Sequence, residues 1–346
     1  MDSEHFVLYS CSNGKFYLVN FNSLTKLLYN KIKKTGTKSI YILKNELNEI
    51  IDKALNPELV DYCKFLYPIV VGIMVTNKCN LNCKYCIANN GNSYSKEDSF
   101  HDISEKILKE LKDSSVVSVI VSGGEPTLYK HLPEFLLKLS NGNYFCLLDT
   151  NGTLITEELI DTLKKTNVIA RISLDSINAS EHDTNRGMFN ATLANIIKMR
   201  KENIDLRINT VLNKMNAKNI DDLAKWISKN GIKKWHVFKL QRAFSSPELW
   251  IDDTETTNIL SHLEKTFGTD IDILFKFSKT NDGFASFVID SDGICFSTQN
   301  KTIGCNQKHV FGDITQESLS EIWQNTPVEY RLRHYNKYLS YTNKNY

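Results

Sequence analysis

Apolar, strand-like stretches alternate with amphipathic, helix-like stretches from residue 68 to residue 240, and this alternation limits the possible folds more than any other feature. Helical spacing in stretches such as SEKILKELKDS and IDDLAKWISKN indicates βαβ units and a parallel sheet. Strands are predicted at 69–76, 116–122, 144–149, 168–174, 206–212 and 235–240. Six such units predict an α/β fold, a partial (β/α)6 barrel of the TIM type, open on one side to a large substrate. Chemistry in such folds gathers at the carboxyl ends of the strands.

The two ends of the chain differ from this barrel, which we place at residues 67–245. Residues 1–66 contain a hairpin signal, HFVLYSC and KFYLVNF around an Asn-Gly turn, and short helical stretches, which together predict a small α+β domain. Residues 246–346 predict a short C-terminal extension that contains β-strands. Its basic, aromatic tail from Pro327 has the composition of frayed helix and solvated coil.

Composition narrows the class of protein. The 346 residues are 41% hydrophobic and 24% charged, with a formal net charge of +2, so we expect neither nucleic acid nor an acidic membrane as a partner. We see no secretory signal and no run of 18 apolar residues. Eight cysteines without such a signal favour reduced thiols and metal ligation, and therefore the cytoplasm.

Three of these cysteines, Cys79, Cys83 and Cys86, have the spacing C-x3-C-x2-C just after the first predicted barrel strand. A closed zinc site needs four ligands, and the nearest other candidates are Cys63 and His101. Thiolate clusters of this kind suit an iron–sulfur centre, which is normally held by four cysteines. Three thiolates on a four-iron cube leave one iron open for chemistry.

Further motifs follow the triplet in order: SGGEPTL, LDTNGT, RISLDS, EHDTNRG and INTVLNKMN. Together they resemble the radical S-adenosylmethionine (SAM) family over about residues 68–240. The resemblance implies one site-differentiated [4Fe-4S] cluster, SAM on its open iron, reductive cleavage of SAM, and hydrogen abstraction from a substrate. It also implies an electron donor such as flavodoxin or ferredoxin.

The same resemblance assigns roles around SAM to residues of these motifs. They are Tyr85 beside the adenine, Gly123 and Gly124 at the methionine amine, Glu125 shaping their turn, Asn151 at the nucleoside, Ser173 and Asp175 toward the ribose or sulfonium, Arg186 at the carboxylate, and Asn213 on the adenosyl side. A guanidinium suits the carboxylate because it can donate two parallel hydrogen bonds.

Two cysteines lie in the C-terminal extension. The segment DGICFSTQNKTIGC resembles the start of the SPASM or twitch extension of peptide-modifying radical SAM enzymes, which binds auxiliary clusters. No cysteine follows Cys305, and two ligands do not complete a four-thiolate site, so we expect a degenerate extension without an auxiliary cluster. Cys295 or Cys305 remains a candidate hydrogen donor, whereas Cys146 reads as a core thiol.

The preferred hypothesis is therefore a radical SAM enzyme that crosslinks, forms a thioether in, or epimerises a ribosomally made precursor peptide. The N-terminal domain would bind a leader peptide by strand addition, or simply cap the barrel. A second hypothesis is a small-molecule radical SAM enzyme such as a viperin-like nucleotide dehydratase, for which Lys214, Lys239 and Arg242 are the candidate phosphate ligands. A third is a non-catalytic partner subunit.

Overall fold

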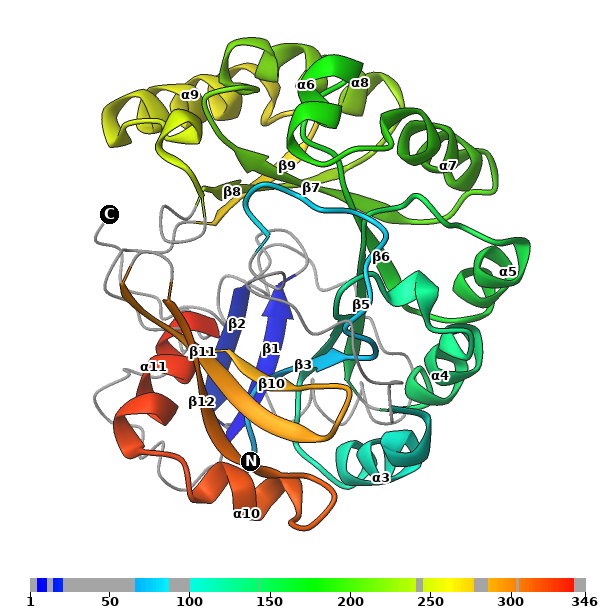
Figure 1. Ribbon diagram of the computed structural model, residues 1–346, viewed down its shortest axis with the longest axis vertical. Helices are drawn as coiled ribbons and strands as arrows, with labels where there is room; N and C mark the ends of the chain where they lie inside the picture. Colours follow the sequence, from blue (N-terminus) through cyan, green and yellow to red (C-terminus); the bar gives the residue numbers. More distant parts are fainter. Residues whose placement is uncertain are drawn as a thin grey trace.

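A ten-stranded, mostly parallel sheet forms the centre of the molecule (Figure 1). The computed structural model describes residues 5–10, 15–20, 66–86, 100–142, 144–240, 245–276, 286–302 and 305–338. The strand order is β12-β11-β10-β3-β4-β5-β6-β7-β8-β9, and every neighbouring pair from β10 to β9 is parallel. The sheet does not close between β12 and β9, so the predicted partial barrel is confirmed.

All six predicted barrel strands are present. They are β3 (Val70–Met74), β4 (Ser118–Ser122), β5 (Phe145–Thr150), β6 (Ile169–Ser173), β7 (Leu206–Leu212) and β8 (Lys234–Lys239). Two strands from beyond residue 245 extend this sheet in parallel: β9 (Asp272–Lys276) beside β8, and β10 (Phe287–Ile289) beside β3. The sheet therefore continues into the region that we assigned to the C-terminal extension.

Helices cover the outer side of the curved sheet (Figure 1). They are α3 (Phe100–Lys112), α4 (Leu132–Leu139), α5 (Glu157–Lys165), α6 (Ala179–Asn185), α7 (Phe189–Lys201), α8 (Ile220–Lys229) and α9 (Asp253–Phe267), with short 3₁₀ turns η3 (Pro126–Leu128), η4 (Ala217–Asn219) and η6 (Pro247–Leu249). Side-chain caps start several of them; for example, Thr156 accepts a hydrogen bond from the Leu159 amide.

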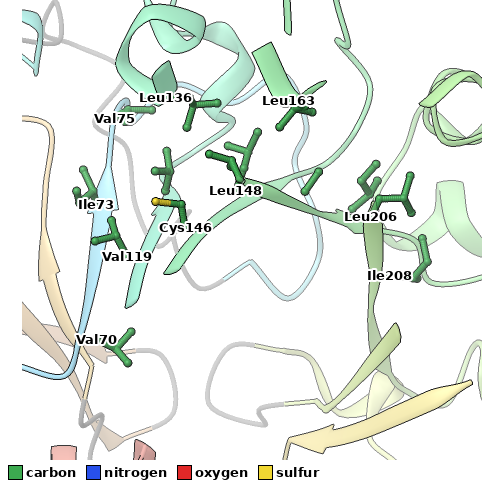
Figure 2. Close-up of a cluster of buried hydrophobic side chains, with 14 of the residues drawn as sticks. Val70, Ile73, Val75, Val119, Leu136, Cys146, Leu148, Leu163, Leu206 and Ile208 are labelled. Atoms are coloured by element: carbon green, nitrogen blue, oxygen red, sulfur yellow. The ribbon is translucent and has the colours of Figure 1, made fainter. Parts of the chain in front are cut away.

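The hydrophobic core lies between the sheet and these helices. Cys146 and Leu148 of β5 belong to it, as does Leu136 of α4 (Figure 2). Because strand side chains alternate, Asp149 is on the opposite, inner face of the sheet. The prediction that Cys146 is a core thiol is confirmed, since it is 4% exposed.

The C-terminal segment continues with a long hairpin, β11 (Ile294–Thr302) and β12 (Cys305–Asp313), then α10 (Leu319–Gln324) and α11 (Val328–Tyr338). The expectation of frayed helix and coil from Pro327 is corrected for α11. His334 is fully buried, and its Nε2 accepts hydrogen bonds from the amides of Ile69 and Val70 at 3.1 and 3.3 Å. A buried polar side chain with backbone partners therefore holds this helix against the start of β3.

The predicted N-terminal hairpin is present as β1 (His5–Ser10) and β2 (Lys15–Asn20), which pair antiparallel in a sheet of their own. Its Asn-Gly turn and the helices expected up to residue 66 lie outside the described residues. Among the residues described, no helix is long and apolar enough to span a membrane.

Candidate active site

The cysteine triplet lies in the loop that follows β3, at the carboxyl end of that strand. All three thiols are partly buried. The Leu81 amide donates a hydrogen bond to Cys79 Sγ at 3.4 Å, and the Cys86 amide donates to the Cys83 carbonyl at 3.2 Å. Hydrogen bonds to thiolate sulfur are one means by which a protein tunes an iron–sulfur cluster.

The turn after β4 packs directly against this cysteine loop. The amide of Gly124 donates to the Thr76 carbonyl at 2.8 Å, and the amide of Glu125 donates to the Lys78 carbonyl at 2.7 Å. A Cβ added to Gly123 or Gly124 would lie 2.2 Å from one of these carbonyl oxygens. We predicted that the glycines allow close approach to a ligand; in the structure they allow close approach to the cysteine loop.

Glu125 links two loops through its carboxylate, which is 1% exposed. Oε1 accepts hydrogen bonds from the hydroxyls of Thr127 and Thr150 at 2.7 and 2.6 Å, and Oε2 accepts from the Asn151 amide at 2.7 Å. Burial raises the pKa of Glu125, and these hydrogen bonds oppose that shift. These bonds connect the turn after β4 to the loop after β5.

Asn151 follows β5, and its side-chain amide has partners within the protein. Nδ2 donates to Oδ1 of Asn80 at 2.9 Å, and Oδ1 accepts from the Thr153 hydroxyl at 2.7 Å. Asn80 follows Cys79 directly, so Asn151 contacts the cysteine loop.

Arg186 lies above the cysteine loop and is held by a buried acid. Its Nε donates to Oδ2 of Asp175 at 2.8 Å, and its guanidinium is 5.3 Å from the centre of the Tyr85 ring. Asp175 is fully buried, and its other oxygen accepts from the Val211 amide at 2.9 Å. Asp175 was predicted to point toward SAM; in the structure its carboxylate positions Arg186, and the contact with SAM finds no support there.

The two remaining predicted contacts also differ from each other. Ser173 ends β6 and is partly buried. Asn213 is fully buried. Its side-chain Nδ2 donates to the Val211 carbonyl at 3.0 Å, and its Oδ1 accepts from the Met215 backbone amide at 2.9 Å. Because these bonds stabilise the turn after β7, Asn213 supports the site instead of presenting its side chain to it.

The thiols are electrostatically linked to one another and to Arg186. Burial raises the pKa of Cys83 to about 11, Arg186 opposes this, and the neighbouring thiols Cys86 and Cys79 add to it. In the described residues no three Cys, His, Asp or Glu side chains could hold one metal ion. Three thiols in one loop instead suit an iron–sulfur cluster, which is held by several cysteine thiolates.

Unpaired polar atoms beside the loop give a second test of fit. The hydroxyl of Tyr85 and both amide atoms of Asn185 are buried and have no hydrogen-bond partner. The backbone carbonyl of Asn185 accepts from the Lys84 amide at 3.1 Å, so this residue lies against the cysteine loop. Buried groups of this kind point to a missing partner. Together with three thiols, they fit the predicted cluster and SAM.

The candidate hydrogen donors do not lie in this site. Cys295 is fully buried in β11, where alternation turns its side chain toward the core, so its role as a donor finds no support. The side chain of Cys305 lies outside the described residues. Seven positions along β12 separate Cys305 from Gly312, the partner of Cys295, which is about 23 Å at 3.3 Å per residue. These two cysteines are therefore too far apart to bind the same cluster.

Two positioning residues escaped the sequence analysis. Asn80 bonds to both Asn151 and Thr153, and His182 Nδ1 accepts from the Asp175 amide at 3.4 Å. Burial lowers the pKa of His182, which favours the neutral ring that this bond requires. The signal for Asn80 was present as an amide residue beside the first cysteine, but sequence alone does not show what it contacts.

A known family model matches the part of the chain that carries these motifs. Residues 73–227 match the model of the Radical SAM superfamily. The AdoMet-dependent heme synthase of Methanosarcina barkeri is 27% identical over 301 residues, which cover 77% of this chain and 85% of that protein. The sporulation killing factor maturation protein SkfB of Bacillus subtilis is 29% identical, over 47% of this chain and 40% of that protein. The chain thus spans less than half the length of SkfB.

Among solved structures, Streptococcus suis SuiB bound to S-adenosylmethionine has a similar fold. The two superpose with a TM-score of 0.66 at 15% identity, over 96% of this chain and 90% of that one. SuiB bound to its precursor peptide SuiA gives the same TM-score over 99% of this chain.

Proposed function

Because the chain belongs to the radical SAM superfamily through residues 73–227, we propose that it modifies a ribosomally synthesised precursor peptide. The reaction would be a crosslink, a thioether or an epimerisation. Residues 1–66 would recognise the peptide, residues 67–245 would carry the chemistry, and residues 246–346 would complete the barrel and its entrance.

The residues of this chain divide the work around the cofactors. Cys79, Cys83 and Cys86 would hold a [4Fe-4S] cluster, and Arg186 would bind the SAM carboxylate from its place between Asp175 and Tyr85. When bound, the cluster and SAM supply a carbon-centred radical that takes a hydrogen atom from the substrate. The inner face of the sheet would orient the peptide and exclude water from that radical.

The observation that carries the peptide proposal is the extent of the fold likeness. It is not confined to the barrel: it covers 99% of this chain in the comparison with SuiB bound to a precursor peptide. In the described residues, β1 and β2 pair with each other in a two-stranded sheet. An open strand edge is what an extended peptide needs in order to add a strand.

Further partners follow from the chemistry. Reductive cleavage of SAM consumes one electron, so we include a small electron donor such as flavodoxin or ferredoxin. We place the enzyme in the cytoplasm, where thiols stay reduced.

Co-expression with a precursor peptide encoded beside the gene tests the proposal. We expect a mass change in the peptide with the native enzyme and none with Cys83→Ala. A variant of the enzyme that lacks residues 1–20, co-expressed with the same peptide, should modify less of it while still cleaving SAM. An unchanged peptide, in a strain where the enzyme cleaves SAM, would contradict the peptide substrate.

A haem precursor is the second candidate, and the alignment with the heme synthase over 85% of its length favours it. Anaerobic incubation with an iron porphyrin separates the two: a change in the Soret absorption, with SAM consumed, would support this candidate. A nucleotide triphosphate has weaker support, because Lys239 already forms an ion pair with Asp253. Arg242 lies outside the described residues.

A further inference from the structure

Three side chains beside the first cysteine form a closed ring of hydrogen bonds. Asn151 Nδ2 donates to Asn80 Oδ1 at 2.9 Å, the Thr153 hydroxyl donates to Asn151 Oδ1 at 2.7 Å, and Asn80 Nδ2 donates to that hydroxyl at 2.8 Å. Each member both donates and accepts within the ring. Because such bonds polarise one another, a closed ring is stronger than three separate bonds.

One side of the ring is fixed to the barrel. The Asn151 amide donates to the buried carboxylate of Glu125 at 2.7 Å, and its carbonyl accepts from the Thr192 hydroxyl of α7 at 3.0 Å. Asn151 and Thr153 are both buried. The hydrogen bonds of the ring therefore tie the position of the Asn80 side chain to that of the loop after β5.

The other side of the ring is the cysteine loop itself. Asn80 is exposed, yet both ends of its side-chain amide are bound to protein. The same Nδ2 lies 3.8 Å from the sulfur of Met188, a residue with a left-handed φ of 56° at the start of α7. Residues other than glycine rarely adopt this backbone conformation unless the surrounding structure holds them in it. Asn80 thus joins the cysteine loop to the loop after β5 and to the turn between α6 and α7.

We propose that Asn80 is a positioning residue that couples Cys79 to the SAM side of the site through Asn151. This inference rests on the proposed assignment of the loop to the cluster. Asn80 is covalently attached to Cys79, so a shift of the β5 loop on ligand binding would move a cluster ligand. If SAM binding and the position of Cys79 are coupled through this ring, a change at Asn80 should in turn alter the affinity for SAM.

The test is SAM binding to the cluster-loaded enzyme, measured as the equilibrium dissociation constant and as the change that SAM causes in the EPR spectrum of the reduced cluster. Asn80→Ala should weaken SAM binding by about five- to tenfold, the effect of losing bonds of this strength, and should alter that spectral change. Asn151→Ala should do the same. The double variant should bind no more weakly than the weaker single variant, because both remove the same ring.

Asn82→Ala is the matched control, since Asn82 is also exposed and is two residues further along the same loop. It should weaken SAM binding less than Asn80→Ala does, because Asn82 lies outside the ring. Thr153→Val removes a member of the ring at nearly constant side-chain volume, and Thr153 lies outside the cysteine loop. This variant therefore still tests the proposal if Asn80→Ala fails to bind a cluster. We expect the same spectral change and about threefold weaker binding for it.

The proposal is overturned if Asn80→Ala and Thr153→Val bind SAM like the native enzyme, or if the effects of Asn80→Ala and Asn151→Ala multiply. If the native enzyme neither binds nor cleaves SAM, the proposed function itself is overturned, and the Asn80 proposal falls with it.

Discussion

The two groups of cysteines show how surroundings decide what a thiol can do. Cys79, Cys83 and Cys86 are partly buried in one loop after β3, with Arg186 close enough to oppose the burial that raises the pKa of Cys83. Cys295 lies inside β11 within the core, where burial and then Asp290 and Asp313 raise its pKa. A cation favours thiolates and thus metal ligation, whereas an apolar core with nearby carboxylates keeps a thiol protonated and inert.

Substitution of a single cysteine should separate the two groups most strongly. Cys83→Ala removes one of three cluster ligands, so we expect no production of 5′-deoxyadenosine from SAM. Cys295→Ala should leave SAM cleavage within about twofold of the native rate, because this thiol touches no part of the site. Chromatographic measurement of 5′-deoxyadenosine checks both variants. Retained cleavage by Cys83→Ala would refute the role of the triplet.

The buried acid behind Arg186 should matter next. Asp175→Asn weakens the charged hydrogen bond that positions Arg186, so we expect SAM affinity to fall by about tenfold or more. Equilibrium binding of SAM measures this loss. Asp149→Asn, which breaks the bidentate pair with Arg171 on the inner face, is the matched control and should leave SAM affinity much less affected. Equal losses in the two variants would contradict the role of Asp175.

Substitution of two tightly packed glycines compares the cysteine loop with the C-terminal segment. A Cβ at Gly124 would lie 2.2 Å from the Lys78 carbonyl, so Gly124→Ala should push the cysteine loop away and lose most of the bound iron. Gly312 lies in β12, beside β11 and α10, and a Cβ at this position would lie 2.6 Å from Glu317 Oε1. Gly312→Ala should lower the free energy of unfolding by about 1–2 kcal/mol and keep its iron. Iron analysis and urea unfolding test the pair, and iron loss from Gly312→Ala alone would reverse our account.

The smallest expected effect is the pH dependence that Cys295 confers. Its pKa is raised above the ordinary value of 9.0, so the folded state retains a proton that the unfolded state releases. The resulting stabilisation is complete below about pH 9 and is lost as the pH rises toward the folded-state pKa, by at most about 1.4 kcal/mol per pH unit. Urea unfolding of the cluster-free chain at pH 8, 9 and 10 should show a shallower decline for Cys295→Ala. Parallel declines would contradict the shift.

Sequence patterns predicted the barrel well because its strands are apolar runs between amphipathic helices. They did not predict that β9 and β10 join the two edges of the parallel strands, since strand pairing between distant segments depends on tertiary packing. They also missed α11, because its buried residues include Arg331 and His334, which read as exposed until their backbone partners are known.

For the site, the motifs indicated loops that the structure brings together, but not which of their atoms remain open. Arg186 and Tyr85 lie together beside the triplet, as the resemblance implied. Asp175 and Asn213 instead bond within the protein, and Gly124 packs on the cysteine loop. A motif reports that a position is needed near the cofactor; only the hydrogen bonds show whether it touches the cofactor or supports a residue that does.

Iron and sulfide analysis after anaerobic reconstitution tests the central claim most directly, in the native chain and in two variants. One variant replaces Cys79, Cys83 and Cys86 with alanine, and the other replaces Cys295 and Cys305. We predict about four irons per chain in the native enzyme and in the Cys295/Cys305 variant, and almost none in the triplet variant. About eight irons in the native enzyme, or unchanged iron in the triplet variant, would contradict the assignment of one cluster to the loop after β3.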